Sequence, residues 1–218
     1  GGDGVYIGGS GNGPARNIRL KNLVCDNNYR QGISITNVDG LTVEDCVFRN
    51  TWGTPPSSGA DIEPDSPDEL VKDVVFRRCR FEDNYGDGIA VFLSRAAGEV
   101  SILFEDCYVT SSRGSGIRVT KLKAGGPTGL IEFRNCVVES TVAYGIKVQD
   151  KLVDQGRVRF VNCTVRDAAN NRQYAGAWAP IWLHSKLSAK FGGIDFENCT
   201  VEDDRVRPER VLLDHVEE

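Results

Sequence analysis

Hydrophobic and polar residues follow a pattern that recurs seven times, at intervals of about 27 to 35 residues. Each copy opens with a small residue followed by an apolar, a variable and a second apolar residue. About 19 residues later comes a segment that reads apolar–x–Phe–x–Asn/Asp–Cys–x–apolar. Apolar residues at every second position predict short β-strands, and a fixed period near 28 built from strands and turns is typical of a solenoid. The opening segments are 4–7, 32–35, 59–62, 88–91, 116–119, 145–148 and 180–183.

Each repeat contains the elements of one solenoid coil. A second strand supplies two inward apolar residues, as in Ile102 and Phe104, and a third short strand follows the cysteine. Between these two strands lies a residue suited to a left-handed turn, usually Asn or Asp. These turn residues are Asn22, Asp45, Arg78, Asp106, Asn135, Asn162 and Asn198. The sequence therefore predicts an all-β, single-stranded parallel β-helix of about seven coils with three short strands per coil, over residues 1–201.

Six of the seven cysteines occupy the same place in successive repeats, which predicts one inward column. Cysteine packs as a small hydrophobic residue, and the chain has no CxxC or His-rich cluster of the kind that binds zinc. Cys25 falls two residues after the column position, where other repeats carry Phe or Val. We interpret these cysteines as core residues.

Composition restricts the classes of function. The net charge of −5 does not indicate nucleic-acid binding, and no apolar run is long enough to span a membrane. Residues 202–218 are highly charged and are expected to form a cap or tail. The absence of methionine indicates a processed, excised or engineered piece, and uncapped coil ends would allow a larger parent chain or a homo-oligomer.

The opening strands predict two outward columns, two and four positions after the small residue. We expect both columns to face solvent. The first column contains Tyr6, Ser34, Asp61, Ala90, Arg118, Lys147 and Trp182. The second contains Gly8, Thr36, Glu63, Phe92, Thr120, Gln149 and His184.

These columns place charged residues at two ends of one face. Asp61, Glu63 and Asp65 repel one another unless a cation offsets them, and their oxygens suit Ca²⁺. Arg118 and Lys147 lie on adjacent strands, where a bound anion would relieve their repulsion. The alternative is that Arg118 reaches across Ala90 and forms an ordinary surface ion pair with Asp61.

Two corners are longer than the others, from Cys46 to Gly59 and from Cys163 to Pro180. Trp52 lies in the first and Trp178 in the second. Insertions on one edge of a solenoid often line a binding face.

The repeat resembles the right-handed parallel β-helix proteins of the pectate-lyase-like superfamily over nearly the whole chain. Gly86-Asp87-Gly88 is similar to the second motif of polygalacturonase-like hydrolases, and Gly116–Thr120 to part of the fourth. Ser58 stands where those hydrolases carry a first aspartate, and the G-H-G histidine has no counterpart. One of the two carboxylates that hydrolysis needs is therefore missing.

The resemblance implies a carbohydrate-active protein, either a polysaccharide lyase or a glycosidase, that is secreted, periplasmic or at the cell surface. It implies an acidic polysaccharide bound along the opening strands, with Ca²⁺ at Asp61, Glu63 and Asp65. Lys147 or Arg118 would be the base, and Asp87 is a further catalytic candidate. The candidates for sugar contact are Trp182, Trp178, Tyr144, Phe92 and His184. The alternative is a non-catalytic β-helix that serves as a scaffold, adhesin or glycan-binding segment.

Overall fold

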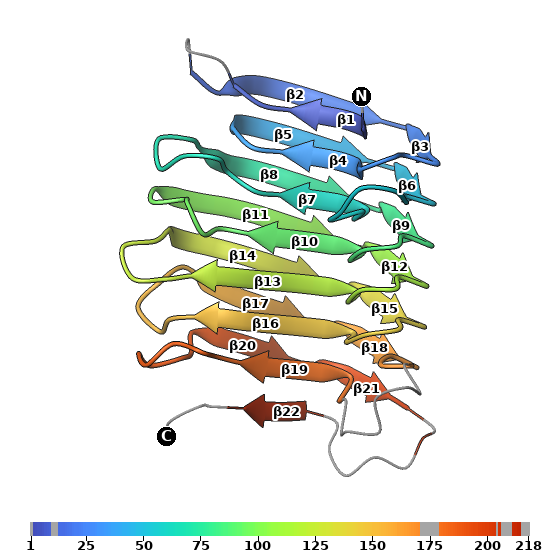
Figure 1. Ribbon diagram of the computed structural model, residues 1–218, viewed down its shortest axis with the longest axis vertical. Helices are drawn as coiled ribbons and strands as arrows, with labels where there is room; N and C mark the ends of the chain where they lie inside the picture. Colours follow the sequence, from blue (N-terminus) through green and yellow to red (C-terminus); the bar gives the residue numbers. More distant parts are fainter. Residues whose placement is uncertain (1, 10–12, 171–178, 204, 206–210, 215–218) are drawn as a thin grey trace.

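The chain forms a parallel β-helix in the computed structural model, which describes residues 2–9, 13–170, 179–203, 205 and 211–214. Its strands build three parallel sheets that run along the whole described solenoid (Figure 1). The first sheet contains β1 (Asp3–Ile7), β4 (Gln31–Ile35), β7 (Ala60–Ile62), β10 (Ile89–Phe92), β13 (Ile117–Leu122), β16 (Ile146–Lys151), β19 (Ile181–His184) and β22 (Val211–Asp214).

The other two sheets supply the remaining sides of each coil. The second sheet contains β2 (Ala15–Lys21), β5 (Val38–Glu44), β8 (Val71–Arg77), β11 (Glu99–Glu105), β14 (Thr128–Arg134), β17 (Arg157–Val161) and β20 (Ile194–Glu197). The third contains β3 (Val24–Asp26), β6 (Val47–Arg49), β9 (Arg80–Glu82), β12 (Tyr108–Thr110), β15 (Val137–Glu139), β18 (Thr164–Arg166) and β21 (Thr200–Glu202). The described residues thus make seven coils of three strands, as predicted, and β22 adds one more strand beside β19.

The core consists of inward columns that continue from coil to coil. The rings of Phe76, Phe104, Phe133, Phe160 and Phe196 stack in the second sheet with centroids 4.6 to 5.1 Å apart. The predicted cysteine column is confirmed: Cys46, Cys79, Cys107, Cys136 and Cys163 are buried, Cys199 is half-buried, and all are free thiols. Each ring or thiol covers the equivalent residue of the next coil, so the repeat buries one continuous core.

The predicted left-handed turns are also present. All seven turn residues from Asn22 to Asn198 have φ between 51° and 56°. Arg78 is the member without an Asn or Asp side chain, and its guanidinium pairs with Asp45 of the preceding coil at 2.8 Å. These turns fix the register from coil to coil, and the register decides which side chains meet on each face. The described residues include no helix that is long and apolar enough to cross a membrane.

Candidate functional site on the first sheet

The structure confirms the register of the first outward column. Along the first sheet, Ser34 pairs with Asp61, Asp61 with Ala90, Ala90 with Arg118, Arg118 with Lys147, and Lys147 with Trp182. These side chains therefore lie in one row that crosses β4 to β19. With strands about 4.8 Å apart, Asp61 and Lys147 are separated by roughly 15 Å, or three strand spacings.

The expectation that both columns face solvent was wrong for much of their length. Ser34, Asp61 and Ala90 are buried, and Arg118, Lys147 and Trp182 are half-buried. In the second column Phe92, Thr120 and His184 are buried. The side chains at these positions contact one another and the residues that precede each strand, so they point away from the core and yet are only partly exposed to solvent or buried.

Asp61 is held by a residue that the sequence analysis did not identify. Gln31, just before Gly32, is fully buried and donates from Nε2 to Asp61 Oδ2 at 2.8 Å. The Oε1 atom of Gln31 accepts the backbone N–H of Ser58 at 2.8 Å. Burial, together with the nearby Glu63 carboxylate, raises the pKa of Asp61 to about 7.

Asp87 occupies the position equivalent to Gln31 two coils further along. It is buried, and its Oδ1 accepts the backbone N–H of Ser115 at 2.6 Å. Its Oδ2 lies 3.7 Å from Arg118 Nη1. Arg118 therefore pairs with Asp87 and not, as the alternative had it, with Asp61. Burial raises the pKa of Asp87, and the Arg118 guanidinium acts against that rise.

Gln31 and Asp87 follow the same geometric rule. Each lies immediately before a strand glycine, accepts the N–H of the equivalent residue in the next coil, and contacts the outward residue of that next strand. The sequence contains the position that follows this rule, because one residue precedes each opening glycine of the repeats. The role of this position becomes clear only from the direction of its side chain in the structure.

Lys147 lies against aromatic rings. Its Nζ atom is 4.5 Å from the centroid of Trp182 and 5.7 Å from that of Tyr144. Lys147 makes no ion pair with any residue that the structure describes. Burial, and secondly the Arg118 charge, lower the pKa of Lys147 to about 8. A lysine of this kind is partly neutral near pH 8 and can accept a proton.

Three of the candidates for sugar contact, Tyr144, Trp182 and His184, lie together at the end of the row that contains Lys147. Trp182 stacks between Tyr144 and His184, with centroids 4.6 and 4.5 Å apart. The Phe92 ring is covered by Arg118, whose Cζ atom lies 4.9 Å from the centroid. Trp178 lies outside the described residues.

The three carboxylates predicted to bind Ca²⁺ line one small pocket of about 60 Å³ at the other end of the row. Asp65 is exposed there and lies 3.8 Å from Arg95. Among the described residues, no three His, Cys, Asp or Glu side chains form a group that could hold a metal ion. Calcium binding at Asp61, Glu63 and Asp65 therefore stays a prediction from the sequence.

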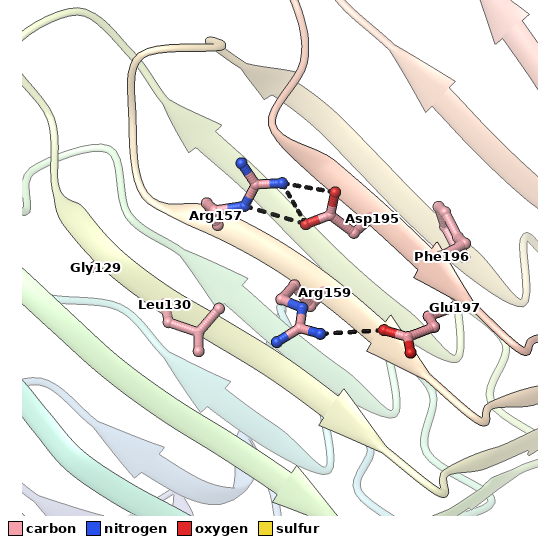
Figure 2. Close-up of a pocket in the computed structure, with 7 residues that line it drawn as sticks. All are labelled: Gly129, Leu130, Arg157, Arg159, Asp195, Phe196 and Glu197. Carbon is pink, nitrogen blue, oxygen red and sulfur yellow. Dashed lines mark hydrogen bonds and ion pairs between the residues drawn. The ribbon is translucent and has the colours of Figure 1, made fainter.

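A larger hollow, of about 650 Å³, lies on the second sheet (Figure 2). Its charged side chains pair with one another: Arg157 with Asp195 at 2.6 Å and Arg159 with Glu197 at 3.2 Å. Leu130 and Gly129 line the same hollow. Its charges are neutralised within the protein, so this surface offers less to a charged ligand than the first sheet does.

Residues 1–125 match a family model described as the right handed beta helix region, and this match spans more than half of the chain. The chain belongs to this family of right-handed β-helices. No curated protein matches the sequence.

Solved structures that are similar to this chain include three large proteins. The Agl-KA catalytic domain is similar with a TM-score of 0.60 and 14% identity, over 99% of this chain and 44% of that one. A tailspike protein, gp49 from Acinetobacter baumannii bacteriophage Fri1, described as a capsular polysaccharide depolymerase, has a TM-score of 0.43 and 15% identity over 94% of this chain and 38% of its own. The mannuronan C-5 epimerase AlgE4 A-module of Azotobacter vinelandii has a TM-score of 0.44 and 11% identity, over 93% and 58%.

This right-handed β-helix thus spans between 38% and 58% of the length of these three proteins. At 14% identity the likeness to the Agl-KA catalytic domain concerns the fold alone, and a fold does not determine the chemistry of the side chains that it carries.

Proposed function

We propose that the chain binds an acidic polysaccharide on the first sheet and cleaves it by β-elimination, with Lys147 as the base. The observation that carries this proposal is the adjacent pair Arg118 and Lys147. They face each other across β13 and β16, and only Arg118 has a carboxylate partner among the described residues. The carboxylate of a uronic acid would relieve the repulsion between the two cations.

Arg118 and Lys147 would have different roles in the elimination. The Arg118 guanidinium would pair with the uronate carboxylate, either keeping its contact with Asp87 or giving it up. This pairing draws electron density away from C5 of the sugar and makes the C5 proton more acidic. Neutral Lys147 would take that proton on Nζ. The electron pair of the C5–H bond would form a C4=C5 double bond, the bond from C4 to the glycosidic oxygen would break, and that oxygen would leave with a proton from water.

The pKa of about 8 at Lys147 supports this assignment, because an ordinary lysine remains protonated at neutral pH. Asp87 would keep the Arg118 guanidinium in register through its bond to the Ser115 N–H. Polymers of uronic acids are met mainly outside cells, so the proposal includes a secreted or cell-surface location.

The test follows the ultraviolet absorbance of the new double bond on alginate and polygalacturonate. Lys147→Ala should lower the rate by roughly 10²- to 10⁴-fold, the usual contribution of a general base. Wild-type activity should rise with pH and reach half its maximum near pH 8. Arg159→Ala removes a half-buried cation from the second sheet, and this matched control should leave the rate unchanged.

Two results would contradict the proposal: no cleavage of any uronan by the wild-type chain, or a Lys147→Ala variant as active as Arg159→Ala. Binding without cleavage would instead favour the second candidate, a glycan-binding β-helix without catalysis. The serine at position 58 favours that candidate over a glycosidase, because it leaves the hydrolase motif with one carboxylate fewer.

A further inference from the structure

The acidic end of the first sheet contains a pocket that the proposed elimination does not use. It lies beside β1, β4 and β7 and is lined by Tyr6, Arg30, Ser34, Thr36, Asp61 and Glu63, together with Asp65. Its volume of about 60 Å³ suits a small polar group and not a whole sugar ring.

Two carboxylates in this pocket, those of Asp61 and Glu63, form no ion pair with any described residue. Asp61 is 3% exposed, and its Oδ1 atom has no hydrogen-bond partner among the described residues, while Oδ2 is held by Gln31. Glu63 forms no ion pair in the described part of the chain, and it contributes to the raised pKa of Asp61. A buried polar atom without a partner is costly, so an unpaired carboxylate oxygen at a pocket indicates a missing donor.

The other charged groups at the pocket are already paired. Arg30 lies 3.3 Å from Asp3, and Asp65 lies 3.8 Å from Arg95. Arg30 is therefore not available to neutralise both Asp61 and Glu63. The charge that remains to be balanced is negative.

An aromatic ring lines this pocket. Tyr6 is 59% exposed, and its hydroxyl is 3.2 Å from Thr36 Oγ1. A tyrosine held in this way offers a ring face to a sugar and attracts a nearby cation through its π electrons. The hydroxyl groups of Ser34 and Thr36, which also line the pocket, can accept hydrogen bonds.

We propose that this pocket binds the ammonium group of an amino sugar, so that the first sheet recognises a glycan carrying both amines and carboxylates. An ammonium group needs only three acceptors. A calcium ion needs six to eight oxygen ligands, and the described residues here do not form such a group. The ammonium half of this inference stands on the pocket alone, and the carboxylate half rests on the proposed function.

The test measures binding of a glucosamine hexamer by isothermal titration calorimetry near neutral pH. The N-acetylated hexamer, which has the same length and no charge, is the matched ligand. We expect the free-amine hexamer to bind at least 10-fold more tightly, and Glu63→Gln to remove that preference. Asp61→Asn, which keeps an oxygen for Gln31, should have the same effect, and Glu197→Gln on the second sheet should have none.

The outcomes separate this inference from the proposed elimination. Lys147→Ala should abolish cleavage of uronans and leave the amine preference unchanged, because the two sites lie roughly 15 Å apart. Equal binding of the two hexamers, or a Glu63→Gln variant that keeps the preference, would overturn the inference. The inference would also be overturned if the protein bound calcium and not the amine hexamer, and if Glu63→Gln and Asp61→Asn both abolished the calcium binding.

Discussion

The outward faces of the first and second sheets use charge in opposite ways. On the second sheet, oppositely charged residues of neighbouring coils alternate and pair: Arg77 and Arg134 with Glu105, and Arg159 with Glu132. On the first sheet, Asp61 contacts an amide and Lys147 contacts aromatic rings. Both sheets come from the same repeat, so the fold alone does not require this difference.

The comparison shows where the solenoid departs from its most stable arrangement. Opposite charges on adjacent strands stabilise a sheet, and the second sheet follows that rule. The first sheet places two cations side by side and buries two carboxylates. Departures of this kind, with shifted pKa values, concentrate at sites of binding and catalysis.

The largest effect should come from removing the buried charge of Asp61. Its pKa is about 7 in the folded chain and 3.8 as an ordinary carboxyl, so the unfolded state ionises first as pH rises. The wild type should therefore lose stability between about pH 4 and pH 7. The full shift corresponds to roughly 4 kcal/mol. The free energy of unfolding of Asp61→Asn, measured with denaturant, should not show this loss. The difference between the variant and the wild type should therefore be about 4 kcal/mol larger at about pH 8 than at about pH 4.

Glu63, Asp87 and Asp3 also face Asp61 and raise its pKa, while Arg30 lowers it. The matched control is Asp195→Asn on the second sheet, where the carboxylate pairs with an exposed arginine. That change should alter the free energy of unfolding by less than about 1 kcal/mol. Equal pH dependence in the Asp61→Asn variant and the wild type would show that Asp61 ionises normally.

A loss of comparable size is expected from Gln31→Ala. The substitution leaves the Ser58 N–H and the Asp61 carboxyl without their shared partner. Each buried group that loses its hydrogen bond costs about 1 to 3 kcal/mol, so chemical denaturation should show a destabilisation of about 2 to 6 kcal/mol for the two groups together. A change below about half a kcal/mol would mean that water replaces the amide.

The smallest effect concerns two lysines that share a lowered pKa. Loss of solvation lowers the pKa values of both Lys147, which is half-buried, and Lys151, which is buried, to about 8. Lys151 is fully enclosed and donates to the carbonyls of Leu152 and Gln155 at 2.7 and 3.2 Å. Acylation near pH 8, followed by mass spectrometry, should label Lys147 several-fold faster than the exposed Lys72 and leave Lys151 unlabelled.

A soluble uronan should protect Lys147 from this reaction and leave Lys72 as reactive as before. If Lys147 and Lys151 were labelled equally, the distinction between a lysine on the binding face and one in a structural corner would fail.

The sequence predicted the fold and register because both depend on short-range alternation that repeats seven times. The row from Ser34 to Trp182, the thiol column and the left-handed turns all follow from that period. The burial of Asp61 did not follow, because it depends on Gln31, a residue just outside the alternating segment. The partner of Arg118 was missed for the same reason, since Asp87 lies at the bend before its strand.

The cysteine column allows local unfolding of the solenoid to be followed coil by coil. Cys46, Cys79, Cys107, Cys136 and Cys163 are buried inside the column. Cys199 at one end of the column is half-buried, and so is Cys25, which lies beside the column in the first coil. A thiol reagent can reach an interior cysteine only when the coils that flank it separate. The order in which the seven sulfurs react would therefore record, coil by coil, the route along which the stack comes apart.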